Sequence, residues 1–253
     1  MSLAELVVVM AIFSLLLLIL YTLMSQSVRI WHNVSGSETA LLVLKKAQRI
    51  LEADLLETSS PQSLVTKVPP SLPGGGRDGS AVWFLSAAGP AGSLVQKPDG
   101  TAFWQRNVLY YLVVPGGHTA CAGGIGARGF DDCCPHKVLL RKTIDNPPPT
   151  DPSSDPSTTE ETLLTNAEIQ PYLTRPTSLN TAAMMGEPHV TSVEVVATNL
   201  LWFEVTRPTT GELQMDLRAV ALEDASRKLT IGARSLGSSP FTLSQPVSVF
   251  PNN

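Results

Sequence analysis

The sequence predicts an α+β fold in which one long N-terminal α-helix packs on a head built around an antiparallel β-sheet. The prediction rests first on proline and glycine: residues 1–60 contain no proline and a single glycine, Gly36, and all 20 prolines come later. Proline costs about 3 kcal/mol inside a helix and glycine about 1 kcal/mol. We therefore expect a helix over residues 1–57 and a β-rich head over residues 58–253.

The first half of the predicted helix is apolar on all sides. Among the first 24 residues only Ser2, Glu5, Ser14 and Thr22 are not apolar, and residues 6–28 carry no charge. About 20 apolar residues cross a hydrocarbon layer of roughly 30 Å, so this half predicts a transmembrane helix. A carboxylate inside such a segment costs a few kcal/mol unless it is paired. We therefore expect Glu5 to have a functional partner.

The second half of the predicted helix is amphipathic. Leucine and alanine recur at the spacing of one helical face, at Leu41, Leu44, Ala47, Leu51 and Leu55. Such a stripe predicts packing against the chain's own core.

A weak point is expected within the long helix, over residues 33–38. Gly36 lies there, and Ser35 with Glu38 has the spacing of a helix-capping box. The helix is expected to kink or restart at this point.

Beyond Pro61, short apolar runs separated by turn residues predict strands. No helical pattern of 10–15 residues alternates with them, so the sheet is expected to be antiparallel. The last two runs, joined by R-P-T-T-G-E, predict a hairpin, and the proline- and serine-rich stretch 145–161 predicts an exposed loop. The predicted strands are Ala81–Ala87, Arg106–Val114, Lys137–Thr143, Ser192–Thr206 and Leu213–Leu222.

Three cysteines, Cys121, Cys133 and Cys134, lie close together in the sequence. In an oxidising compartment two of them are expected to form a disulfide, Cys121 with either Cys133 or Cys134, because adjacent cysteines rarely meet the geometry of the bond. Two alternatives remain open: a metal site that includes His136, whose spacing departs from the usual zinc pairs, and reduced thiols. We expect the disulfide and no metal.

Charge and motif content exclude several classes of function. The chain has 18 Lys and Arg against 22 Asp and Glu, and a protein that neutralises phosphates needs a concentrated basic face. No pattern for nucleophilic or metal-assisted catalysis, such as G-x-S-x-G or H-E-x-x-H, occurs in the sequence. The sequence therefore predicts a protein that is not an enzyme, with no cofactor and no nucleic-acid partner.

The run S-L-A-E-L-V-V-V-M-A-I-F-S-L-L-L-L-I-L at residues 2–20 resembles the N-terminus of type IV pilins and type II secretion pseudopilins. Processed chains of that family begin with a hydrophobic residue, have Glu at the fifth position and continue as an apolar helix. Many pilins carry a glycine and a proline near the positions of Ser14 and Thr22, so their absence favours a pseudopilin or minor pilin. In the head, Y-Y-L-V-V followed by V-L-L-R-K resembles the J-type minor pseudopilins.

This resemblance implies a structural subunit of a type IV pilus-like or type II secretion pseudopilus filament, with a pilin-like fold. It implies that prepilin peptidase removes a short basic leader ending in Gly and that Met1 is N-methylated. Glu5 would pair with the N-terminal ammonium of a neighbouring subunit during filament assembly. The implied partners are copies of this chain or other pilin-like subunits, an inner-membrane assembly platform, and the lipid bilayer before assembly.

The implied location is the inner membrane with a periplasmic head, followed by an extracellular or periplasmic filament. Two alternatives to a filament subunit remain. The first is a one-span membrane protein whose exported β-domain binds a ligand or partner, and the second is a secreted enzyme that still carries its signal.

Overall fold

The computed structural model describes most of the helix and the sheet. Met1, the three cysteines and residues 147–159 of the proline-rich stretch lie outside the described residues, so the disulfide and most of the loop remain predictions. The described residues are 2–59, 63–68, 79–89, 93–113, 137–146, 160–173, 180–220 and 242–251.

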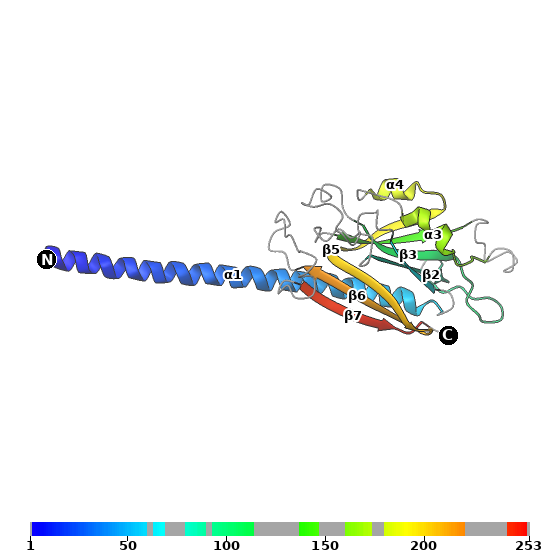
Figure 1. The fold of residues 1–253 in the computed structure, drawn as a ribbon, viewed down its shortest axis with the longest axis horizontal. Coiled ribbons are helices and arrows are strands. Elements are labelled where there is room, and N and C mark those ends of the chain that lie inside the picture. Colours follow the sequence, from blue (N-terminus) through cyan, green and yellow to red (C-terminus); the bar gives the residue numbers. More distant parts are fainter. Residues whose placement is uncertain are drawn as a thin grey trace.

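The long helix α1 spans Leu3–Leu56, 54 residues, or about 81 Å at 1.5 Å per residue. Its first half projects alone from the head (Figure 1). The predicted kink or restart at residues 33–38 is wrong, because the helix is continuous through them. Ser35 caps no new helix; its carbonyl instead accepts a 2.9 Å hydrogen bond from Thr39 Oγ1, one turn later in the same helix.

The head contains a sheet of seven strands among the described residues, arranged in sequence order with every neighbouring pair antiparallel. The five predicted strands are confirmed with small shifts of their ends, and so is the hairpin. The first and last strands were not predicted. The strands are β1 Ser63–Lys67, β2 Ser80–Ser86, β3 Arg106–Val113, β4 Lys137–Ile144, β5 Val190–Thr209, β6 Glu212–Val220 and β7 Thr242–Val249.

The sheet curls strongly because the two halves of β5 pair with different strands. The first half of this 20-residue strand pairs with β4 and the second half with β6. The other end of the sheet returns to the second half of β5: Gly79 forms a parallel bridge with Phe203, and Lys67 in β1 makes a 2.9 Å ion pair with Glu204. The curled sheet thus has a concave face that receives the second half of α1.

The core lies between α1 and this concave face. Leu44, Ala47, Leu51 and Leu55 are fully buried, which confirms the predicted stripe over most of its length. The prediction is wrong for the first residue of the stripe, because Leu41 is 38% exposed and the neighbouring Ala40 is buried instead. The helix packs mainly against β5, β6 and β7. Apolar partners from these strands include Val196, Leu200, Phe203, Met215, Leu217 and Val247.

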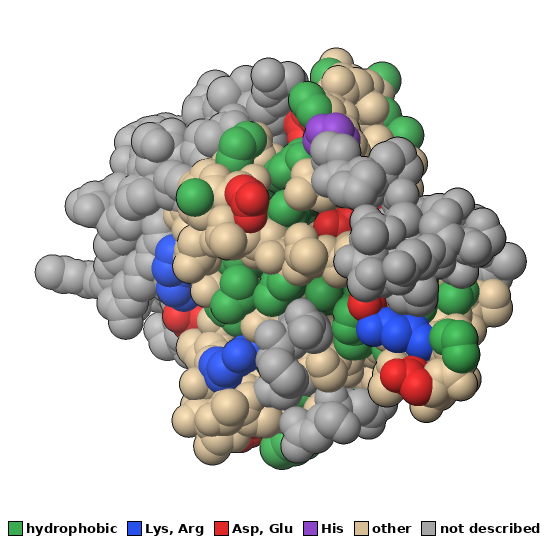
Figure 2. All heavy atoms as spheres, turned by 90° about the vertical axis from the view of Figure 1, so that its right-hand side faces the viewer, with side chains coloured by type: hydrophobic (Ala, Val, Ile, Leu, Met, Phe, Trp, Pro, Cys, Tyr) green, Lys and Arg blue, Asp and Glu red, His purple; other side chains and the backbone are tan. Residues whose placement is uncertain are grey.

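The opposite face of the sheet carries a second core under two short helices, α3 Asn166–Leu173 and α4 Thr181–Met185. The buried Trp83 of β2 donates a 2.7 Å hydrogen bond from its indole to the carbonyl of Leu164, just before α3. The head is therefore three-layered, with α1, the sheet, and α3 with α4 (Figure 1). At the end away from the projecting helix, apolar side chains lie exposed among acidic and basic ones (Figure 2).

Candidate functional site

The start of α1 is closed by a capping box between Ser2 and Glu5. The Ser2 hydroxyl accepts a 3.3 Å hydrogen bond from the Glu5 amide, and the Glu5 carboxylate accepts a 2.8 Å hydrogen bond from the Ser2 amide. These contacts satisfy two N–H groups that a helix start otherwise leaves unpaired. The negative charge also lies at the positive end of the helix dipole. Glu5 therefore has a partner within its own chain.

The segment from Leu3 to Val28 is long and apolar enough to cross a membrane, and it contains an 18-residue window with a mean hydropathy of 2.9. None of it is buried in the part of the chain that the structure describes. Its exposed residues include bulky side chains such as Phe13, 61% exposed, and Leu16, 56% exposed. Apolar surface of this extent is unstable in water at roughly 25 cal/mol per Å². The segment therefore has the length and composition of a membrane-spanning helix.

Two hydroxyl groups inside this segment donate to the backbone of their own helix. Ser14 Oγ donates to the carbonyl of Met10 at 2.8 Å, and Thr22 Oγ1 donates to that of Ile19 at 2.7 Å. Burying an unpaired hydroxyl in an apolar medium costs several kcal/mol, and these bonds to the helix backbone reduce that cost. The segment is therefore suited to an apolar environment despite its polar residues.

Apolar exposure continues between the membrane-length segment and the head. Trp31 is 73% exposed and Val34 is 51% exposed. Where the helix meets β7, an open groove of about 350 Å³ lies between Val34, Leu41 and Leu243. The helix thus presents apolar side chains along its length up to the head.

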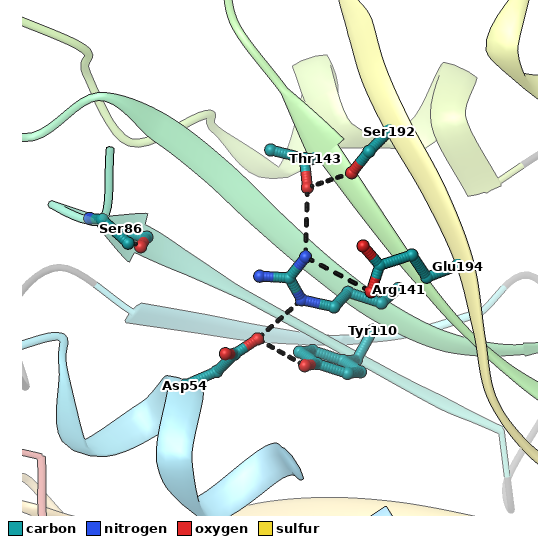
Figure 3. A network of polar contacts seen from close by, with 8 residues as sticks. Asp54, Ser86, Tyr110, Arg141, Thr143, Ser192 and Glu194 are labelled. Atoms are coloured by element: carbon teal, nitrogen blue, oxygen red, sulfur yellow. Dashed lines mark hydrogen bonds and ion pairs between the residues drawn. The ribbon is translucent and has the colours of Figure 1, made fainter. Parts of the chain in front are cut away.

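The far end of α1 is fixed to the sheet by a polar network (Figure 3). Arg141 in β4 donates from Nε to Asp54 at 2.7 Å, Tyr110 in β3 donates its hydroxyl to the same carboxylate oxygen, and Glu194 in β5 lies 3.8 Å from the guanidinium. Burial alone would lower the Arg141 pKa, but Tyr110 and Asp54 outweigh it and the pKa is raised. The charge therefore stays on Arg141 and holds the helix end in place.

Comparisons with known proteins were made at three levels. No protein-family model, curated protein or solved structure matches this chain.

Of the predicted site residues, the structure describes only Glu5. Glu5 is at the exposed helix start, as expected, whereas Met1 lies outside the described residues. The pairing of Glu5 with the N-terminal ammonium of a neighbouring subunit stays a prediction. Cys121, Cys133 and Cys134 also lie outside them, so neither the disulfide nor its alternatives are tested. In the part of the chain that the structure describes, no three His, Cys, Asp or Glu residues gather as a metal site.

One functional residue was missed at the sequence level although its signal was present. That residue is Ser2, which has the S-x-x-E spacing of a capping box with Glu5 at the true helix start. The same spacing had led us to expect a capping box at Ser35 and Glu38. The network around Asp54 and Arg141 had no such signal, because the two residues are 87 positions apart.

Proposed function

We propose that this chain is a structural subunit of a type IV pilus-like or type II secretion pseudopilus filament, assembled through α1. The observation that carries the proposal is the apolar segment Leu3–Val28, none of which is buried by the described residues of its own chain. Before assembly lipid covers this segment; in the filament, the helices of neighbouring subunits cover it. The resemblance of residues 2–20 to the pilin N-terminus supports the same function.

The exposed residues beyond the membrane-length segment add to this support. The 26 residues of Leu3–Val28 already extend about 39 Å, more than a hydrocarbon core of roughly 30 Å. Exposed apolar side chains nevertheless recur beyond it, at Ile30 and Val34, as far as the groove at Leu243, which Ser37 and Glu38 also line. Packing of helices from neighbouring subunits covers this continuation as well as the segment itself.

In this proposal prepilin peptidase processes the chain, Met1 is N-methylated, and the head is periplasmic before assembly. Glu5 pairs with the N-terminal ammonium of a neighbour and fixes the register between subunits. The capping box is compatible with this second contact, because an ionised carboxylate has about four acceptor sites on its two oxygens and the Ser2 amide occupies one of them.

A second candidate function is a one-span anchor for an exported domain. The capping box favours it, since Ser2 gives Glu5 a local role that needs no other subunit. Under this alternative the only role of the Glu5 charge is to stabilise the start of α1.

Three variants separate the two functions. Glu5→Gln keeps the capping box, which accepts Glu or Gln at this position, but removes the charge; Ser2→Ala weakens the box and keeps the charge; Glu5→Ala removes both. The measurement is the fraction of chain in sheared filaments, relative to the fraction inserted in membrane, in cells with the native assembly machinery.

The filament function predicts normal membrane insertion for all three variants. It further predicts that Glu5→Gln and Glu5→Ala are both lost from filaments, by about tenfold or more, while Ser2→Ala is largely retained. Normal incorporation of Glu5→Gln together with loss of Ser2→Ala would assign Glu5 to helix capping alone and contradict the proposed pairing.

A further inference from the structure

A pocket of about 460 Å³ lies on the face of the head opposite α1, beside helix α3. Its volume is within the range of small-ligand sites, about 300–1,000 Å³. Its walls are largely apolar and include Leu164, Pro171 and Pro188. The sheet fixes one wall: Trp83 holds the carbonyl of Leu164, and the Asn107 side chain accepts from the Leu164 amide at 3.1 Å. This wall is thus built before any ligand binds.

A buried ion pair stands beside the pocket. Lys142 Nζ lies 2.7 Å from Glu187 Oε2, with the two side chains 0% and 4% exposed, and it also donates to the carbonyl of Tyr172 at 2.9 Å. The second oxygen of Glu187, Oε1, is buried and has no hydrogen-bond partner in the described part of the chain. Leaving a buried acceptor unpaired costs about 1–3 kcal/mol, and more for a charged group. Glu187 also lines the pocket, so a donor that reaches this oxygen from the pocket would remove this cost.

The pocket is electrically negative. Two carboxylates, Glu168 and Glu187, line it among the described residues, and Lys142 pairs with Glu187. The pKa of Tyr172 is raised by burial first and then by Glu187, Glu161 and Glu168. A ligand with positive charge is therefore favoured over a neutral or anionic one.

We infer that this pocket binds an alkyl guanidinium, the side-chain chemistry of arginine. The guanidinium donates to Glu187 Oε1 and faces Glu168, and its methylene stem packs on the apolar walls at Leu164 and Pro171. A guanidinium is planar, offers five N–H donors and stacks on aromatic side chains, and Tyr172 is among the residues that line the pocket. A lysine ammonium fits less well because it is a compact and strongly hydrated charge.

This inference does not depend on the filament function. It concerns the head alone, and α1 contributes no residue to the pocket wall. The guanidinium has two sources, free arginine or an arginine side chain of another protein, and two probes distinguish them.

The test is calorimetric titration of the full chain in detergent micelles. The probes are N-acetyl-L-arginine N-methylamide, which mimics a chain-borne arginine, free L-arginine, and the neutral isostere N-acetyl-L-citrulline N-methylamide. We expect saturable binding of the blocked arginine with a Kd on the order of 1 mM, as about 0.3 kcal/mol per heavy atom gives for a ligand of this size. Citrulline is expected to bind at least about tenfold more weakly.

Two variants locate the binding. Glu187→Gln and Glu168→Gln are each expected to weaken binding of the blocked arginine, Glu187→Gln by about tenfold. Glu212→Gln, a matched change at the start of β6 opposite Thr209, is expected to leave this binding unchanged. Glu168→Gln serves as the deciding variant if Glu187→Gln fails to give a native near-UV spectrum. Glu168 caps the start of α3 through Thr165, and Gln preserves such a cap.

The outcomes are distinct. Binding of both arginine probes assigns the pocket to the free amino acid or its close derivatives, and binding of the blocked probe alone assigns it to a protein side chain. Absence of arginine binding, or equal binding of citrulline, would overturn the inference. Neither result bears on whether α1 enters a filament.

Discussion

Arg141 in β4 and Asp54 near the end of α1 form a 2.7 Å ion pair that ties the last turns of the long helix to the middle of the sheet. Both side chains are about one-fifth exposed, 19% and 21%, and Tyr110 donates to the same carboxylate.

A double-mutant cycle measures this contact. Asp54→Asn and Arg141→Gln are each expected to lower the free energy of unfolding of the head, with a coupling between them of about 1–3 kcal/mol, as for hydrogen bonds between charged groups. Urea unfolding of the full chain in micelles, followed by the fluorescence of the head tryptophans, gives the four values. Strictly additive effects would show that the ion pair contributes nothing to docking of the helix.

The helix–sheet core is tested by two leucines of α1. Leu51 is fully buried against the sheet, whereas Leu42 is 67% exposed. Leu51→Ala is expected to destabilise the head by about 2–5 kcal/mol because it leaves a cavity, and Leu42→Ala by no more than about 0.5 kcal/mol. The same urea unfolding measurement applies. Similar losses for both variants would contradict the assigned face of the helix.

Glu161 predicts a pH dependence of head stability. Burial raises its pKa to about 7, with a smaller contribution from Asp145, despite hydrogen bonds from the amides of Asn146 and Thr162. A carboxyl with a raised pKa in the folded state binds a proton more tightly there than in the unfolded chain. Its stabilising contribution is therefore complete below the unfolded value near 4.3 and is lost as pH rises toward the folded value.

The measurement is the thermal midpoint of the full chain at acidic and at slightly alkaline pH. Glu161→Gln, which cannot lose a proton, is expected to reduce the decrease in midpoint seen in the unmodified chain on going from acidic to alkaline pH. Glu212→Gln serves as the control and should keep that decrease. An unchanged pH profile in Glu161→Gln would mean that this carboxyl is ionised normally.

Much of the fold could be predicted from the sequence because its signals are local. The near-absence of proline and glycine from residues 1–60 predicted the helix. Apolar runs such as residues 106–114 predicted strands with clear ends. The stripe from Leu44 to Leu55 gave the buried face. Only the first position of the stripe, Leu41, was wrong, since the helix turns Ala40 toward the sheet there.

The missed elements lack such local signals. Strand β1 has only five residues, β7 contains Pro246 within a polar alternation, and α3 contains Pro171 inside eight residues. Each forms because the sheet supplies a neighbour or an apolar surface, which a sequence pattern does not express. For the same reason the pairing of Lys142 with Glu187, 45 positions apart, was not predictable.

The central claim, that α1 packs against other subunits, is tested most directly by a photoreactive benzoylphenylalanine in place of Leu16, at the middle of the apolar segment. In cells with the native assembly machinery, illumination should give adducts between this chain and pilin-like subunits, and Glu5→Gln in the same background should abolish them. Crosslinks to lipid alone, unaffected by Glu5→Gln, would contradict the account.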